Sequence, residues 1–475
     1  MLRIQSIWTI SGLILCSALA GCGSTNQFGS QTQNNGNSSV VLAMTDTPPS
    51  LVSVLSAKVT LTGAKLIPGD IPLLSGSTTV EELTRLQTDI AYIATAPNIP
   101  AGNYTAVTLT FANLSLTIEN DTASAIGTCA VGSICTMTPT APSLSTTVPL
   151  TAFTIASSGT TGLLIDVNLD NLLTATMSAD FSAGTTVTPF TPAGTGAPPV
   201  GAEDVVGQVS NISASSSTFM LTNAAGSFPL KVDNTTTFFQ FPTSVTCPTP
   251  GFACLQNNQI LSVDIGIQSN GTILARNVLF EDADSSDAEV EGMITSTNAG
   301  SLQFNIVALS ISATGTGLNI GEPVTVQYSV SPQTPFDVDF AHADNVQIVT
   351  SGFLFAAPTD LAVGQQVSIR RHSTLPGGQI VADRVRLRST RVTANALRNG
   401  SSIIDIGGLG SIPSIFSGHG VADIQVHTPQ LTICSDGNVV KPCSSISLVP
   451  VSARGPLFID GVGRTIIATR VVEKP

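Results

Sequence analysis

Apolar and polar residues alternate in several short runs along the first part of the chain. Residues 57–62 read AKVTLT, residues 107–111 read VTLTF and residues 114–118 read LSLTI. A period of two residues is typical of a β-strand with one buried face, and Gly- and Pro-containing segments separate the runs. We therefore expect residues 40–185 to form an all-β domain, a β-sandwich.

Three stretches in or after this domain depart from the alternating pattern. In residues 81–94 the apolar side chains lie three or four positions apart, which predicts a short helix. Residues 122–165 carry no charge, but they are rich in Ser and Thr and contain prolines. We expect strands and loops there rather than a transmembrane helix. Residues 186–203 are rich in Pro, Gly and Thr and are expected to be a linker.

Beyond residue 203 the chain repeats itself. The hexapeptide ILARNV at 273–278 returns as IVADRV at 380–385 and as IIATRV at 466–471, each time after a turn containing glycine. A strand precedes each turn, so every unit ends in a β-hairpin. The pattern predicts three small repeated β-barrel-like domains at 204–281, 289–389 and 390–475, for which an OB-like barrel is one form.

The upstream halves of the three units also correspond. Segments 228–239, 323–336 and 421–431 each read as a strand followed by a polar bend. The Gly-rich segment 407–420 of the third unit fits the repeat poorly.

The amino terminus has the features of an export signal. Arg3 is followed by an apolar stretch and small residues, so residues 1–21 are expected to be a signal peptide. The tetrapeptide Leu19-Ala20-Gly21-Cys22 resembles the lipobox of bacterial lipoproteins, which implies cleavage before Cys22 and lipid attachment to its thiol. An ordinary signal peptide that happens to contain a cysteine is the alternative.

The residues after Cys22 are consistent with a lipid anchor. Residues 22–39 form an uncharged polar segment that we expect to be a flexible tether. By the sorting convention of such lipoproteins, Gly23 implies an outer-membrane destination in a cell that has one. The expected location is thus the cell envelope, with the protein anchored by lipid. Whether it lies on the periplasmic or the surface-facing side is left open.

The cysteines fit an exported chain. Of the eight, Cys16 leaves with the signal peptide and Cys22 takes the lipid. The other six form three local pairs, Cys129/Cys135, Cys247/Cys254 and Cys434/Cys443. An even number of closely spaced cysteines in an exported protein predicts disulfides. Zinc ligation is the alternative, but the spacings do not suit it and the four histidines are scattered, so no metal is expected.

Composition excludes several classes of function. Hydrophobic residues make up 42% of the chain and charged residues only 10%, with a net charge of −13. Each domain can bury a core, whereas a nucleic-acid partner, which needs a basic surface, is disfavoured. The sequence contains no P-loop, no zinc-protease motif and no nucleophile elbow. We therefore expect no catalytic residues and no cofactor, and we keep an unrecognised hydrolase as a remote alternative.

One acidic and one basic cluster stand out against this weakly charged background. Six carboxylates fall within residues 281–291: Glu281, Asp282, Asp284, Asp287, Glu289 and Glu291. We interpret them as a solvated interdomain linker, with a calcium site as the alternative.

The basic cluster lies in the second repeat. Arg384, Arg386 and Arg388 alternate with apolar residues and would share one face of a strand, with Arg370 on a neighbouring strand. We favour pairing with carboxylates of a neighbouring domain or plain solvation. A binding site for a polyanion is the alternative, because arginine pairs bidentately with phosphate and carboxylate.

The layout resembles bacterial envelope lipoproteins that carry an N-terminal β-sandwich domain of unknown function followed by tandem small β-barrel domains of unknown function. The resemblance rests on Thr45-Asp46-Thr47-Pro48, on the segment IPAGNY at 99–104 and on the repeated hairpins. It implies no activity and transfers no catalytic residue to this chain.

The leading hypothesis is a non-enzymatic, membrane-anchored envelope lipoprotein that acts as a structural spacer or binding module. The alternative is a surface protein that binds a polyanion or glycan through the arginine face. The expected partners are the membrane, through the N-terminal lipid, and an envelope polysaccharide or protein.

Overall fold

The structure is a computed structural model that describes most of the chain from residue 37 to residue 474. Within this range the structure does not describe residues 48–52, 75–78, 89, 122, 138–140, 142, 170–183, 193–204, 224–225, 242–243, 269–271, 283–287, 312–316, 339–352, 376–378, 401, 409–410, 430–431, 437–438 and 462. The described part is all-β, as the alternating pattern predicts.

Two sheets form the N-terminal sandwich. The first contains, in spatial order, β10 (Thr185–Phe190), β9 (Ser158–Asn168), β1 (Asn37–Thr47) and β5 (Ala91–Ile99). The second contains β3 (Ile71–Leu74), β2 (Ser53–Ile67), β6 (Gly102–Glu119) and β7 (Ile134–Met137), with β4 (Thr79–Glu82) on β2 and β8 (Ser143–Ile155) on β6. Alternate residues of β1, namely Val40, Leu42 and Met44, enter the core between the sheets.

The helix predicted over 81–94 is wrong. The segment holds the end of β4, a short 3-10 helix η1 (Leu83–Gln87) and the start of β5. Leu83 and Leu86 fit the helical spacing because both point into the sandwich core. From residue 91 the pairing of β5 with β1 continues the sheet instead. The strand β10 also extends to Phe190, five residues into the predicted linker.

The first two repeats have the same strand arrangement. The first contains β11 (Val205–Ser213), β12 (Thr218–Asn223), β13 (Gly226–Val232), β14 (Phe238–Gln240), β15 (Ile260–Ile267) and β16 (Ile273–Asp282). The second contains β17 (Ala288–Asn298), β18 (Gln303–Ile311), β19 (Pro323–Gln327), β20 (Phe336–Val338), β21 (Gln366–Leu375) and β22 (Gln379–Leu387). Pairing of β13 with β16, and of β19 with β22, closes each sheet into a five-stranded ring.

The third repeat contains the same ring with additions. Its elements are β23 (Ser389–Asn399), β24 (Ile403–Gly407), α1 (Ser414–Ser417), β25 (Asp423–His427), β26 (Ile433–Asp436), β27 (Val439–Lys441), β28 (Pro450–Asp460), β29 (Gly463–Ile467) and β30 (Arg470–Glu473). When only the five ring strands are numbered in chain order, each ring follows the order first, second, third, fifth, fourth. The third and fifth ring strands are parallel. This is an OB-like Greek-key barrel.

The strand register shows that the three hairpins are equivalent. Ile380 faces Val326 and Ile466 faces Val426, and one position further Leu274, Val381 and Ile467 face Lys231, Gln327 and His427.

A threonine in the polar bend makes the same hydrogen bond in every copy. Thr237 donates to the carbonyl of Ala275 at 2.6 Å, Thr334 to that of Ala382 at 3.2 Å and Thr432 to that of Ala468 at 2.7 Å. The bend thus anchors the short strand that follows it, β14, β20 or β26, to the closing hairpin.

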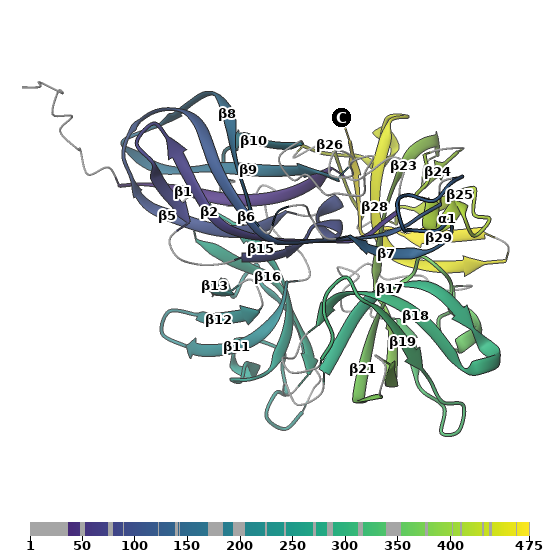
Figure 1. The fold of residues 1–475 in the computed structure, drawn as a ribbon. Coiled ribbons are helices and arrows are strands. Elements are labelled where there is room, and N and C mark those ends of the chain that lie inside the picture. Colours follow the sequence, from purple (N-terminus) through teal and green to yellow (C-terminus); the bar gives the residue numbers. More distant parts are fainter. Residues whose placement is uncertain are drawn as a thin grey trace, which may run out of the picture.

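The four domains pack against one another rather than following in a line (Figure 1). The sandwich and the third barrel lie side by side, with the first and second barrels beneath them. Phe458 and Ile467 of the third barrel belong to the core cluster of the second. Leu55 of the sandwich and Val307 of the second barrel belong to the cluster of the third.

The irregular segment 407–420 has a role in this packing. It includes α1, whose Ile415 and Phe416 are buried. The ring of Phe416 lies over Gly364 of the second barrel so closely that a Cβ there would come within 2.2 Å of it. Gly364 also has a φ of +88°, a conformation that favours glycine.

Candidate functional site

The six cysteines form the three predicted disulfides. The pairs Cys129–Cys135, Cys247–Cys254 and Cys434–Cys443 are bonded, one in the sandwich and one each in the first and third barrels. Disulfides are typical of proteins that fold outside the cytoplasm. The predicted lipid-bearing Cys22 and the tether before residue 37 lie outside the described residues.

The structure keeps two of the predicted stripe arginines together and sets the third apart. Arg384 and Arg386, on β22, both reach Asp337 of β20. Arg384 holds that carboxylate through Nε at 2.7 Å and through Nη2 at 2.6 Å. Arg370 lies opposite Arg384 in the β21–β22 register and opposite Glu289 in the β17–β21 register.

Arg388 is in a different position. It follows the last residue of β22 and is only 4% exposed, so it is not part of a surface stripe. It is also the single residue between the second barrel's last strand and the third barrel's first.

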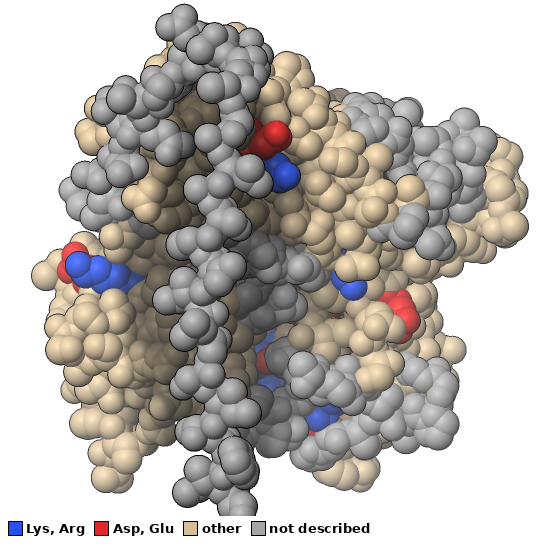
Figure 2. Space-filling view, turned by 60° about the vertical axis from the view of Figure 1, so that its left-hand side comes forward, with Lys and Arg blue, Asp and Glu red and all other residues tan. Residues whose placement is uncertain are grey.

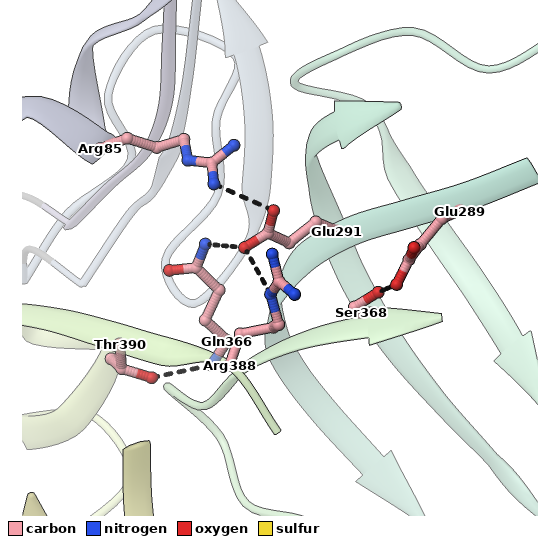
Figure 3. Close-up of polar contacts among 7 residues, drawn as sticks. All are labelled: Arg85, Glu289, Glu291, Gln366, Ser368, Arg388 and Thr390. Atoms are coloured by element: carbon pink, nitrogen blue, oxygen red, sulfur yellow. Dashed lines mark hydrogen bonds and ion pairs between the residues drawn. The ribbon is translucent and has the colours of Figure 1, made fainter. Parts of the chain in front are cut away.

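The buried Arg388 belongs to a polar cluster centred on Glu291 (Figure 3). Glu291 lies on β17 and accepts a hydrogen bond from Arg85 Nη2 at 3.0 Å and one from Gln366 Nε2 at 2.7 Å. Its Oε1 is also 3.6 Å from Arg388 Nε. We call this contact between the sandwich and the second barrel the first seam.

Local structure sets the position of each member of the first seam. Arg85 lies in η1, whose N-cap residue Glu82 accepts hydrogen bonds from Ser56, Ala57 and Thr84. Burial raises the pKa of Glu82, and these donors lower it in part. On the barrel side, the Arg388 backbone N–H donates to the Gln366 carbonyl, which places both side chains beside Glu291.

Burying the charges of the first seam has a desolvation cost. Removing two charges from water costs several kcal/mol per ion, and the attraction repays this only where geometry and further hydrogen bonds are good. Here one carboxylate has two arginines and an amide around it. The cluster therefore joins the sandwich to the second barrel through one shared carboxylate.

Sequence reasoning missed this role of Glu291. The acidic cluster 281–291 was interpreted as a solvated linker, whereas Glu291 is buried in β17. Glu289, two positions earlier, contacts Ser368. Residues 283–287 and the side chains of Glu281 and Asp282 lie outside the description, so the calcium alternative stays a prediction. The sequence signal that could have indicated this buried role is a charged residue within an alternating strand pattern.

The described part of the chain also bears on metal binding, membrane spanning and surface charge. No group of three or more His, Cys, Asp and Glu side chains there is arranged to hold a metal ion. No helix among the described residues is long and apolar enough to cross a membrane. On the face shown in Figure 2, charged atoms occur as a few small spots, several with both signs adjoining, on a largely uncharged surface.

Comparison with known proteins gave no match. No protein-family model matches the chain, and neither a curated protein nor a solved structure does so at a significant level. Any functional argument therefore rests on this chain's own residues.

Proposed function

We propose that the protein is a non-enzymatic, lipid-anchored envelope lipoprotein whose four β-domains pack together into one structural or binding module. The observation that carries the proposal is the first seam, in which Glu291 joins Arg85 of the sandwich to Arg388 at the junction of two barrels. A chain of independent spacers would not need buried charges between its domains.

The anchor is supported by Leu19-Ala20-Gly21-Cys22 and by the polar segment that follows. An acylated cysteine is held at about 0.8 kcal/mol per buried methylene, so several chains give stable attachment. The folded module would then stand close to the bilayer, within the reach of a short tether.

Replacement of the anchoring cysteine tests this proposal. In Cys22→Ser the protein should move from the membrane fraction to the soluble fraction and should no longer partition into the detergent phase. Cys16→Ser, in the signal peptide, is the matched control and should leave the mature protein in the membrane. Continued membrane association of Cys22→Ser would contradict the lipid anchor, while pull-down from envelope extract with the mature protein would identify a bound component.

The polyanion alternative has less support. Arg384 is the most exposed of the three stripe arginines, at 38% of its side chain, but it shares Asp337 with Arg386. A polyanion would have to displace an internal carboxylate whose Oδ2 already lies 2.7 Å from Nε and 2.6 Å from Nη2 of Arg384. The arginine face is therefore better explained as part of the second barrel's own surface.

A further inference from the structure

The sandwich also contacts the third barrel, and this second seam differs from the first. On the sandwich side it contains the end of β6, with Glu119 as its last residue, and the loop that the Cys129–Cys135 disulfide closes. Ile134 from this side packs against the core cluster of the third barrel. On the barrel side the contact is made by α1 and the residues that follow it.

Two carboxyls and one histidine meet at the second seam. His419 Nε2 lies 3.8 Å from Glu119 Oε1. Gly418 lies beside Asp121, close enough that a Cβ there would be 3.2 Å from Asp121 Oδ1. Glu119 is only 6% exposed, so its carboxyl lies largely out of water where the two domains meet.

The two carboxyls of the second seam each have a buried oxygen that lacks a hydrogen-bond donor among the described residues. Glu119 Oε2 and Asp121 Oδ2 are buried, and neither has a hydrogen-bond partner among the described residues. A buried carboxylate without donors carries the full cost of desolvation, which binding a proton removes. Burial, together with the nearby charge of Asp121, raises the pKa of Glu119 from its usual 4.5 to about 7.

The surroundings of Glu119 contain few other titratable groups. The strands paired with it place Ser53 and Ile134 opposite, neither of which carries a charge. Among the described residues, the groups that face it are Asp121 on its own segment and His419 from the third barrel.

We propose that the second seam is a proton-controlled joint, in which protonated Glu119 holds the third barrel against the sandwich and loss of the proton loosens it. The joint concerns the folded module alone and does not depend on the lipid anchor. A failed anchoring test would leave it untouched.

The direction follows from linkage. In the docked state Glu119 has a pKa of about 7, and in an opened state its carboxyl returns to water and to its usual value. The docked state therefore binds more protons, so docking is strongest at acid pH and weakens as pH rises. The opening equilibrium should grow by up to about tenfold per pH unit between roughly pH 5 and 7 and then level off.

Hydrogen exchange of the full mature chain, measured by mass spectrometry between pH 5.5 and 8.5, tests the joint. Exchange is divided by the intrinsic rate at each pH. In the wild type, protection of residues 119–137 and 411–421 should fall by about tenfold per pH unit up to pH 7, while that of β17 and β18 stays constant. In Glu119→Gln, which keeps the shape and carries no charge, protection of the seam should stay high at every pH.

Asp423→Asn is the matched control, because Asp423 is an exposed carboxyl on the same barrel. It should keep the wild-type pH dependence. The proposal is overturned if the wild-type seam is equally protected at pH 5.5 and 8.5, or if Glu119→Gln keeps the pH dependence.

Discussion

The two seams of the sandwich both bury a glutamate, but they differ in what surrounds it. At the first seam Glu291 has Arg85, Gln366 and Arg388 around one carboxylate. At the second, Glu119 has a single histidine contact and a second carboxyl, Asp121, nearby. The same side chain thus has three donor groups around it in one place and a shortage of donors in the other. We therefore expect donor supply, together with burial, to decide how strongly each domain contact depends on pH.

The largest expected effect comes from breaking the first seam. Glu291→Ala leaves Arg85 and Arg388 without their shared carboxylate. Breaking a buried ion pair from one side typically costs about 3–5 kcal/mol, and we expect a loss of that size in the free energy of unfolding. Urea denaturation followed by circular dichroism measures it.

The matched control for Glu291→Ala is Glu322→Ala, on the same barrel. Glu322 accepts hydrogen bonds only from Asn319 among the contacts described for it, and its loss should cost less than about 1 kcal/mol. A second test replaces the whole cluster by Arg85→Met, Glu291→Leu and Arg388→Met. Because no charge is then left buried, most of the lost stability should return. A Glu291→Ala protein as stable as the wild type would contradict the importance of the seam.

The second seam can be loosened through its disulfide. Replacing Cys129 and Cys135 by serine opens a short loop and should cost about 2–3 kcal/mol by loop entropy. The pair Cys247 and Cys254 closes a loop of similar size in the first barrel, and its replacement should cost a similar amount.

The two disulfide variants should differ in where they act. Only the first should expose the seam, because Ile134 lies inside that loop and packs against the third barrel. Limited proteolysis distinguishes them: new cleavage near residues 119–137 is expected in the first variant alone. Equal cleavage in both would place the loop outside the seam.

Local features of the fold were predictable, and contacts between distant residues were not. The three barrels follow from the repeated hexapeptides, because one strand pairing repeats in the same register at Ile380 and Ile466. The disulfides follow from close spacing in sequence. The failure at 81–94 has a local cause, since apolar residues of a short 3-10 turn and of a following strand together mimic a helical period.

The seams were beyond the sequence for a physical reason. Arg85 and Glu291 are 206 positions apart, and no periodicity in either segment indicates that they meet. The same holds for Glu119 and His419, which belong to the first and last domains. Only the packed arrangement of four domains brings such groups together. Charge patterning therefore predicted one arginine stripe, whereas in the structure Arg384 and Arg386 share Asp337 and Arg388 is buried beside Glu291.

The smallest expected effect concerns one hydrogen bond of the first seam. Thr117 of β6 is fully buried and donates from Oγ1 to the carbonyl of Gly321 in the second barrel at 2.7 Å. Thr117→Val keeps the shape but leaves that carbonyl without its donor, which should cost about 1–2 kcal/mol. Thr136, which shares a hydrogen bond with Thr117 from the exposed end of the neighbouring strand, is the matched control. Thr136→Val should stay within about 0.5 kcal/mol of the wild type.

The pH dependence of this loss separates the two seams. A hydroxyl donating to a carbonyl does not titrate, so Thr117→Val should lower the free energy of unfolding by the same amount at pH 6 and pH 8. Glu119→Gln should behave differently: it removes a group that destabilises the docked state only when ionised, so its stabilising effect should appear as pH rises towards 7 and above. Urea denaturation of both variants at the two pH values gives the comparison. A Thr117→Val loss that changes with pH would mean that the first seam also depends on a proton, and the distinction between the seams would then fail.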